Sequence, residues 1–207
     1  MMKVSDITIQ KLNDGKLVKD LPELYELKDA VENNAWHKND SVFSHTVAVL
    51  EKLEEIEKAA SKKANSCLDQ RIGLHSRRQV IFLATLLHDI SKKETLVKKE
   101  GITSCPNHGE AGSLKAMKIL GRFDLSRNEK EMVAEIIKHH VELNDMLEPG
   151  NKKLGEQYKK FKSEFHDLFL EFVLLSMADL LGSQLKENSP ARFDFRLNFY
   201  NKILSDF

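Results

Sequence analysis

The chain has 207 residues, of which 41% are hydrophobic and 31% are charged, a composition typical of one soluble globular domain and not of a disordered segment. Lys and Arg number 32, and Asp and Glu also number 32, so the formal net charge is zero. This balance argues against a large nucleic-acid interface, which usually carries a basic excess, but it leaves room for a local positive patch that handles one phosphate.

The N-terminal residues and the two cysteines indicate a cytoplasmic, reducing environment. The first residues, MMKVSD, lack the apolar core of a secretory signal. The longest apolar runs are under half of the roughly 20 residues that a membrane span needs. Cys67 and Cys105 lie far apart and form no CxxC motif, so a framework of several disulfides is excluded. We therefore expect a cytoplasmic protein with no membrane partner.

Helical periodicity dominates the chain, which has only nine glycines and four prolines. Residues 1–20 are mixed in character and are expected to form an N-terminal arm, with the main domain over residues 21–207. Hydrophobic spacing and end signals predict helices over about 21–34, 41–62, 80–90, 110–123, 126–140, 163–181 and 191–204. Loops or charged connectors are expected at 61–76, 92–105 and about 149–151. The pattern predicts an all-α fold, a compact single-domain bundle of roughly seven to nine helices.

Two of the expected helices begin with side chains that cap a helix. Asp40 or Ser41 can cap the helix that starts near residue 41, because a side-chain oxygen there accepts from a free backbone N–H. Ser126 and Glu129 have the spacing of a capping box, in which each side chain accepts from the backbone of the other. The sequence leaves the choice between Asp40 and Ser41 open.

Histidine and aspartate occupy positions where the helical periodicity requires a core residue. His88 and Asp89 end the most apolar helix, and Asp179 lies within the second most apolar one, so each needs a partner that offsets the cost of its burial. In the helix that ends at residue 140, the helical wheel places His140 at the centre of the apolar face and His139 on its edge. We favour His140 as the inward side chain, although the sequence does not decide which of the two is a ligand.

His45 and His108 extend this set of polar residues. His45 lies on the apolar side of its helix, and His108 directly precedes a helix start. Imidazole and carboxylate are ligands of divalent transition metals, and a shared metal would neutralise the buried acids. Each residue alone has a structural alternative, since a buried histidine is usually a hydrogen-bonded core residue and Asp179 could pair with an arginine such as Arg196. Their occurrence together favours a metal site.

The order of these residues resembles the HD superfamily of metal-dependent phosphohydrolases. That family carries a first histidine, an adjacent His-Asp pair and a late aspartate on separate helices, and the matching residues are His45, His88, Asp89 and Asp179. The segments WHKNDSVFSHT (36–46) and LLHDISK (86–92) are similar to the HD domains of bacterial tRNA nucleotidyltransferase and poly(A) polymerase relatives, with Ser91 in place of the usual glycine. The resemblance covers roughly residues 21–204 and implies a helical bundle of the HD-domain type.

The resemblance also implies a role for each matching residue. His45, His88, Asp89 and Asp179 would hold one divalent metal, and His108 and His140 would hold a second with Asp89 as the bridge. The metal is Mn, Fe, Ni, Co, Mg or Zn, in one or two copies. Asp89 and Lys92 would act in catalysis, with Lys92 on a phosphate oxygen, unless Lys92 is a solvated surface lysine like Lys93, Lys98 and Lys99. His37 would line the substrate pocket, but a cap or a surface position is equally open.

The function implied by the resemblance is hydrolysis of a phosphomonoester or phosphodiester by metal-activated water, with a nucleotide or a cyclic phosphate as the favoured substrate. The alternative is a regulatory module that binds a nucleotide or a metal without turnover, and a third interpretation is a purely structural metal. No Gly-Ser motif with paired aspartates precedes the HD-like region, so we do not expect nucleotide addition. The expected partner is a small phosphorylated substrate, and a homodimer is left open.

Overall fold

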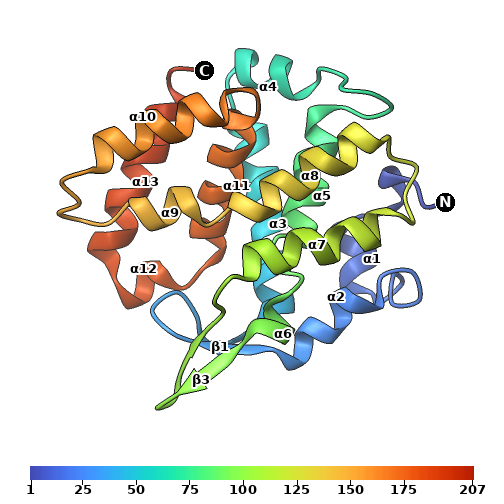
Figure 1. The fold of residues 1–207 in the computed structure, drawn as a ribbon, viewed down its shortest axis with the longest axis horizontal. Helices are drawn as coiled ribbons and strands as arrows, with labels where there is room; N and C mark the ends of the chain where they lie inside the picture. The colour runs from blue at the N-terminus through green and yellow to red at the C-terminus, as the bar shows by residue number, and fades with distance from the viewer.

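The protein is built almost entirely from helices, as the computed structural model of residues 1–207 shows (Figure 1). The α-helices are α1 (Ile9–Asn13), α2 (Pro22–Glu26), α3 (Val42–Ala59), α4 (Lys62–Leu68), α5 (Arg77–Leu87), α6 (Lys92–Thr95), α7 (His108–Leu120), α8 (Arg127–His139), α9 (Glu142–Met146), α10 (Leu154–Glu164), α11 (Phe169–Gly182), α12 (Leu185–Asn188) and α13 (Pro190–Leu204). Short 3-10 turns lie at Val4–Asp6, Leu27–Asp29 and His166–Leu168. The predicted all-α fold is confirmed.

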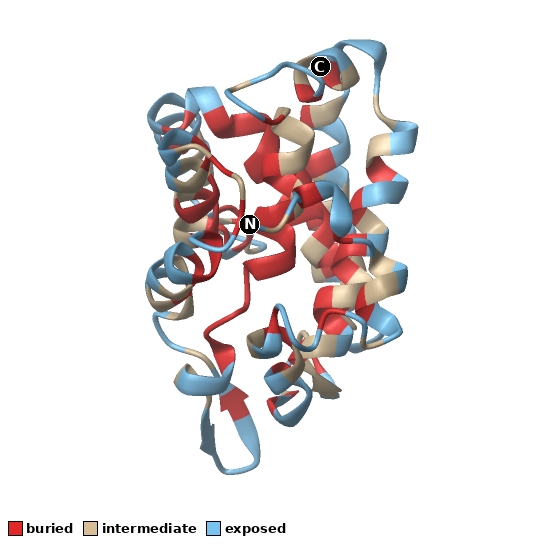
Figure 2. Ribbon diagram, turned by 90° about the vertical axis from the view of Figure 1, so that its right-hand side faces the viewer, coloured by how far each residue is buried: buried red, intermediate tan, exposed pale blue.

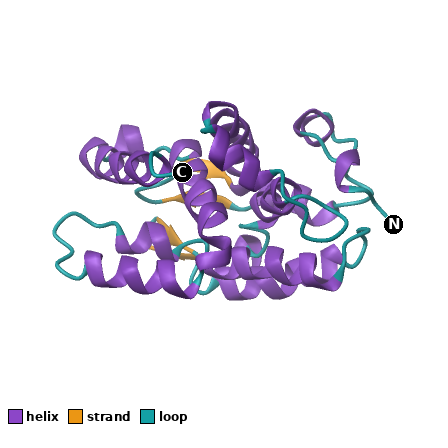
Figure 3. Ribbon diagram, turned by 90° about the horizontal axis from the view of Figure 1, so that it is seen from above, coloured by secondary structure: helices purple, strands orange, loops and turns teal.

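Strands are confined to two small antiparallel hairpins (Figure 3). β1 (Val31–Asn33) pairs with β2 (Lys38–Ser41), and β3 (Val97–Lys99) pairs with β4 (Ile102–Ser104). Glu100 and Gly101 connect β3 to β4 with positive φ angles of 52° and 83°, the backbone conformation that a tight hairpin turn requires. In Figure 1 the β3–β4 hairpin extends from the helical body beside β1.

The predicted helix starts are confirmed where a side chain caps them. Ser41, and not Asp40, caps α3 by accepting from the backbone N–H of Ser44 at 3.1 Å. The predicted capping box of Ser126 and Glu129 begins α8, and a second one, formed by Ser76 and Gln79, begins α5. Caps satisfy N–H groups that the first helical turn leaves without a partner, which is why these starts are sharp.

The polar stretches contain more regular structure than the sequence predicted. Residues 61–76 include α4, and residues 92–105 include α6 and the β3–β4 hairpin. The helix predicted over 163–181 is broken, because α10 ends at Glu164 and a 3-10 turn precedes α11. The break lets Phe165 turn back onto Phe172 of α11, with ring centroids 5.0 Å apart. Aromatic packing therefore replaces helix continuation at this point.

The core lies around α11, which is buried on every side over most of its length (Figure 2). α11 packs on α3 and α13, while α5 packs on α3 and α8, and α7 packs on α8. Residues 1–20 contribute Val4, Ile7, Leu12 and Leu17 to the same core. The domain division expected at residue 20 stays a prediction, but this segment is anchored on the helical body. None of the helices combines the length and the apolar character that crossing a membrane requires.

Candidate metal centre

Six of the predicted site residues line one polar cavity of about 160 Å³, and the other two, His45 and His88, contact the cavity residues Asp179 and Asp89. The cavity lies where β1 and the loop after it meet the ends of α5, α8 and α11 and the start of α7. Its walls are formed by Glu32, Asn34, Trp36, His37, Asp89, Lys92, His108, His140, Val141, Asn144, Asp145 and Asp179. Most of these side chains are polar, which is unusual for the inside of a small helical protein.

Three of the histidines are fixed by a backbone carbonyl three residues earlier. The Nδ1 atoms of His88, His108 and His140 lie 2.8, 2.7 and 2.6 Å from the carbonyl oxygens of Thr85, Cys105 and Ile137. A carbonyl oxygen only accepts a hydrogen bond, so Nδ1 of each ring carries the proton. Each ring then turns Nε2 toward the other site residues, the arrangement found in metal-binding histidines. His88 and His140 are also the C-cap residues of α5 and α8.

The Nε2 atoms of the site histidines face one another and carboxylates. Nε2 of His108 lies 3.2 Å from Nε2 of His140, a distance at which the two nitrogens share either one proton or a metal ion. Nε2 of His45 lies 2.9 Å from Oδ1 of Asp179, so this pair shares a cation, either a proton or a metal ion. Metal binding at such a pair replaces the proton. Both contacts therefore fit a positively charged ion.

Asp89 lies between the two sets of ligands. Its Oδ1 is 3.5 and 3.6 Å from Nε2 of His108 and His140, whereas its Oδ2 is 3.1 and 3.7 Å from Nε2 of His88 and His45. Neither oxygen accepts a hydrogen bond of good geometry, although Nζ of Lys92 forms an ion pair with Oδ2 at 2.9 Å, and Nε2 of His88 also has no hydrogen bond; all three atoms are buried. Buried polar atoms without partners are rare and call for an ion or another ligand. The carboxylate is thus placed to bridge two cations.

The potential ligands form two groups, and within each group the potential ligand atoms all lie within 4.8 Å of one another. One group is His45, His88 and Asp179, and the other is Asp89, His108 and His140. Nitrogen and carboxylate oxygen in sets of three suit divalent transition metals and leave coordination positions for water or substrate. The residues of this chain therefore fit one or two divalent ions.

Two glycines allow the helix ends that carry these ligands to approach each other. A Cβ on Gly109 would lie 2.5 Å from the carbonyl oxygen of Lys138, so the start of α7 touches the end of α8 directly and brings His108 to His140. A Cβ on Gly182 would lie 2.9 Å from the backbone nitrogen of Val49, where the end of α11 meets α3. Any larger side chain at either position would force the helices apart.

The electrostatic environment shifts the pKa values of several candidate ligands. Burial would lower the pKa of His88, but the charges of Asp89 and Asp179 outweigh it and raise this pKa. Burial is the main cause that lowers the pKa of His108 to about 4, assisted by the neighbouring His140. Burial would raise the pKa of Asp89, but the charges of His88 and Lys92 hold this pKa well below its ordinary value. Burial acts in the same way on Asp179, and there the hydrogen bond with His45 prevails and lowers the pKa. At neutral pH the site thus has ionised carboxylates and a neutral His108.

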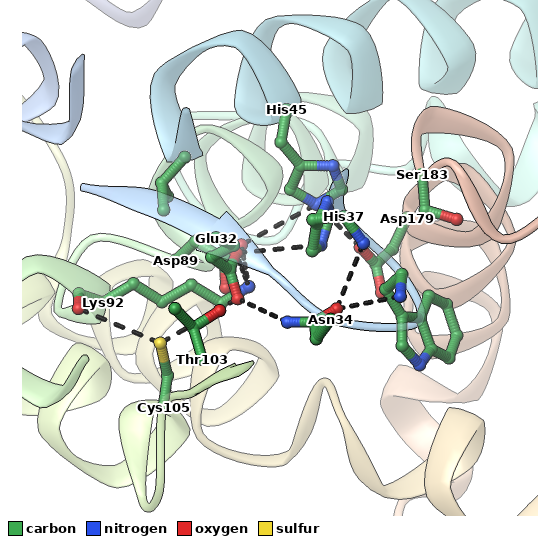
Figure 4. Close-up of polar contacts among 12 residues, drawn as sticks. Glu32, Asn34, His37, His45, Asp89, Lys92, Thr103, Cys105, Asp179 and Ser183 are labelled. Carbon is green, nitrogen blue, oxygen red and sulfur yellow. Dashed lines mark hydrogen bonds and ion pairs between the residues drawn. The ribbon is translucent and has the colours of Figure 1, made fainter. Parts of the chain in front are cut away.

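Lys92 and His37, the two residues expected to meet the substrate, both line the cavity (Figure 4). Lys92 is buried and not a solvated surface lysine: its Nζ donates to Oε2 of Glu32 at 2.8 Å and lies 2.9 Å from Oδ2 of Asp89. Burial lowers the pKa of Lys92, but the charges of Asp89 and Glu32 outweigh it and raise the pKa, so the amine stays protonated. His37 is buried edge-on against His45, and burial lowers its pKa to about 3.

The structure separates the two alternatives that the sequence left open. His140 faces the cavity, whereas His139 is partly exposed and contacts Glu142 on the surface. Arg196 does not pair with Asp179. It bonds to Glu148 and to the backbone oxygen of Asn144, so the arginine explanation for the buried aspartate is wrong.

Glu32 and Asn144 are cavity residues that the sequence did not reveal. Glu32 falls in a stretch predicted as the end of a short helix, and its inward orientation depends on the β1–β2 hairpin. Asn144 donates to Oδ2 of Asp179 at 3.1 Å and accepts from the hydroxyl of Tyr200 at 2.7 Å. Neither residue belongs to a periodic pattern, so no local signal identifies them.

Comparison with known proteins assigns the family. The family model described as HD domain matches residues 42–169, which is more than half of the chain. A bifunctional uridylyltransferase/uridylyl-removing enzyme of Novosphingobium aromaticivorans is 33% identical over 101 residues, covering 49% of this chain and 10% of that protein. Enzymes of the same name from Ruegeria pomeroyi and Bradyrhizobium diazoefficiens are 25% and 22% identical, over 68% and 86% of this chain and 14% and 18% of their own length. The chain spans less than a fifth of the length of these relatives. On the strength of the family match, the chain belongs to the HD domain family.

Proposed function

We propose that the protein is a metal-dependent phosphohydrolase that cleaves a phosphomonoester or phosphodiester. The observation that supports this most directly is the buried carboxylate of Asp89, which accepts no hydrogen bond of good geometry and turns one oxygen to each of two groups of candidate ligands. A buried carboxylate in this setting is suited to bridging two divalent ions. Such ions lower the pKa of a bound water and neutralise charge on the phosphoryl group.

The chain's own residues supply positioning and charge around that centre. His45, His88, Asp89 and Asp179 would hold one ion, and His108, His140 and Asp89 the other. Lys92 contributes a buried ammonium that can donate to a phosphoryl oxygen. The Asn144 amide, itself bonded to Tyr200, keeps Asp179 turned toward His45.

The cavity is large enough to admit the phosphoryl group of a substrate, with a volume of about 160 Å³. Trp36, Asn34 and Asp145 line the same cavity and are available to contact the rest of the ester. The names of the relatives include uridylyl removal, which favours a nucleotide phosphoester as the substrate.

The test is turnover of a panel of phosphoesters by protein stripped of metal and then loaded with Mn, Fe, Ni, Co, Mg or Zn. The panel includes p-nitrophenyl phosphate, bis-p-nitrophenyl phosphate, nucleoside monophosphates and cyclic nucleotides. We expect turnover with at least one metal, loss of it in His88→Ala, and full activity in the control His166→Ala, whose side chain is exposed. Metal binding without any turnover would favour a regulatory module, and absence of both would reject the proposal.

A further inference from the structure

Glu32 is a buried acid in the cavity wall that neither group of potential ligands includes. It is 3% exposed and lies on β1, opposite the His-Asp pair. Its Oε2 accepts from Nζ of Lys92 at 2.8 Å, and the same oxygen is 3.7 Å from Nε2 of His37. Burying a carboxylate is costly, so its retention at this place calls for a charged partner, and Lys92 is the cation that donates to it. Its other oxygen, Oε1, accepts weaker hydrogen bonds from Asn34 and Cys105.

The position of β1 is fixed from the other side by the β3–β4 hairpin. The backbone N–H of Asn33 donates to the hydroxyl of Thr103 at 2.6 Å, and the side chain of Asn33 donates to the carbonyl of Gly101 at 2.8 Å. Glu32 is adjacent to Asn33, so its carboxylate is held in place by the backbone that carries it. The hairpin, which follows Lys92 in the chain, thus returns to support the partner of Lys92 (Figure 4).

The Lys92 ammonium is only partly engaged in this arrangement. An ammonium has three donors, and Lys92 uses one of them for a hydrogen bond to Glu32. Oδ2 of Asp89 lies 2.9 Å away, but this oxygen has no hydrogen-bond partner, so the contact is an ion pair without hydrogen-bond geometry. Donors therefore remain for an oxygen atom that enters the cavity.

Without Glu32 the ammonium would have one obvious acceptor left. Oδ2 of Asp89 also faces His88 and His45, so a lysine that bonds to it fully would compete with a divalent ion for the same oxygen. The carboxylate of Glu32 also attracts the Lys92 ammonium, and this attraction balances that of Asp89.

We propose that Glu32 is a positioning residue that holds the Lys92 ammonium beside Asp89 but off its lone pairs, so that Asp89 stays free for a metal ion and Lys92 for an oxyanion of the substrate. The inference rests on the proposed function, because that function makes the oxyanion part of a phosphoryl group. It adds a residue that acts through Lys92 and touches neither ion nor substrate.

Two binding measurements that need no turnover test this role. The first is the affinity of the metal-stripped protein for Mn²⁺ by calorimetry, and the second is the affinity of the Mn²⁺-loaded protein for inorganic phosphate. We expect Glu32→Gln to weaken both by about tenfold, because breaking one side of a buried charge pair has large effects. We expect Lys92→Met to weaken phosphate binding but to leave Mn²⁺ binding as strong as in the wild type, or stronger.

The double variant Glu32→Gln/Lys92→Met is decisive. If Glu32 acts through Lys92, then Glu32→Gln has no effect on Mn²⁺ affinity once Lys92 is methionine. If Glu32 acts only as a negative charge near the ions, then Glu32→Gln weakens Mn²⁺ binding in the Lys92→Met background at least as much as in the wild type. That second result, or wild-type affinities in Glu32→Gln alone, would overturn the inference.

Two further variants separate positioning from folding. Glu32→Asp keeps the charge on a shorter side chain, and we expect it to recover most of the Mn²⁺ affinity even if Glu32→Gln folds poorly. Glu171→Gln is a matched control, because Glu171 is equally buried but pairs with Arg77 at the opposite end of α11, and it should leave both affinities unchanged. Failure of the wild type to bind Mn²⁺ would instead reject the metal site and this inference with it, whereas binding without turnover would reject only the proposed hydrolysis.

Discussion

Two regions of the molecule bury a histidine beside a carboxylate, and they differ in what the carboxylate bonds to. At the start of α8, Glu129 is fully buried next to His75, and its oxygens accept from the backbone N–H groups of His75 at 2.6 Å and Ser126 at 2.7 Å. At the end of α5, Asp89 is buried next to His88, and neither of its oxygens accepts a hydrogen bond of good geometry. Burial of a His-acid pair therefore does not by itself mark a functional site. The two pairs differ in that the Glu129 carboxylate accepts backbone hydrogen bonds, whereas the Asp89 carboxylate accepts none.

The two carboxylates also differ in what they contribute, since Glu129 stabilises the fold and Asp89 belongs to the candidate site. The Glu129 carboxylate completes a capping box and orders the loop before α5, so its contribution is to the fold. The oxygens of Asp89 accept no hydrogen bond, and they lie in a cluster that already contains other acceptor atoms. Proteins keep such an unfavourable arrangement where a bound ligand supplies the missing interactions.

The largest effect should come from removing the bridge itself. We expect Asp89→Asn to lower phosphoester turnover by about a thousandfold or more, since metal ions contribute several kcal/mol to such reactions. The metal-free variant should keep its fold, because Lys92 remains paired with Glu32. Turnover and bound metal, measured by elemental analysis, check both statements. An Asp89→Asn variant that retains metal and activity would place the site elsewhere.

Acid should act on the site through His108. Its pKa in the folded protein is about 4, below the value of about 6.5 expected in the unfolded chain. The unfolded chain therefore binds more protons between these two values, and the unfolding free energy of the metal-free protein falls as the pH drops from about 6.5 to 4. Replacing His108 with Gln should reduce this slope by up to about 1.4 kcal/mol per pH unit.

Denaturant unfolding of the metal-free protein at several pH values measures that slope. His166→Gln is the matched control, because its side chain is exposed and does not line the cavity. An unchanged slope in His108→Gln would show that His108 already carries a proton in the folded state.

The glycine contacts allow the two groups of ligands to be separated. We expect Gly109→Ala to cost about 1–3 kcal/mol, the range for overpacking, as the start of α7 moves away from Lys138. The variant should lose the ion held by His108 and His140 and keep the one held by His45 and His88. Metal stoichiometry falling from two to one supports two separable sites, and a loss of both ions would show that they bind as a unit.

The smallest effect should follow from a change at the start of α8, where the buried Glu129 carboxylate accepts two backbone hydrogen bonds. Glu129→Gln removes one of two oxygen acceptors and should cost about 1–2 kcal/mol of unfolding free energy. Metal affinity and turnover should not change, because Glu129 has no contact with the cavity. Thermal unfolding and metal titration of the same preparation test the pair of expectations. A loss of metal binding would contradict this expectation and show that the start of α8 influences the metal site.

Much of the fold could be predicted because its main helices carry strong local signals. Ser126 with Glu129 defines a helix start that tertiary packing leaves unchanged. The apolar run before His88 correctly predicts a helix, but the structure has it at Arg77–Leu87 and not at 80–90. The elements that sequence patterns missed are short, such as α6 and the two hairpins, and their few residues depend on contacts with distant segments. The break before α11 was missed because the phenylalanines continue the helical spacing across it.

The candidate site could be predicted where a polar residue interrupts an apolar helix face. His45, Asp89, His140 and Asp179 are of that kind, and the structure brings all four to the cavity or its edge. Glu32 could not be predicted in this way, because it lies in a hairpin whose position is set by contacts with residues at least sixty positions away in the sequence.

The histidines that end α5 and α8 link the metal site to local unfolding. His88 and His140 are C-cap residues, and each ring holds a carbonyl of the last turn that would otherwise need water. A cation held on the opposite nitrogen would lie near the negative ends of both helix dipoles and restrain both rings. Fraying of these two helix ends would then require release of the ion, so amide hydrogen exchange in their last turns would report occupancy of a site deep inside the protein.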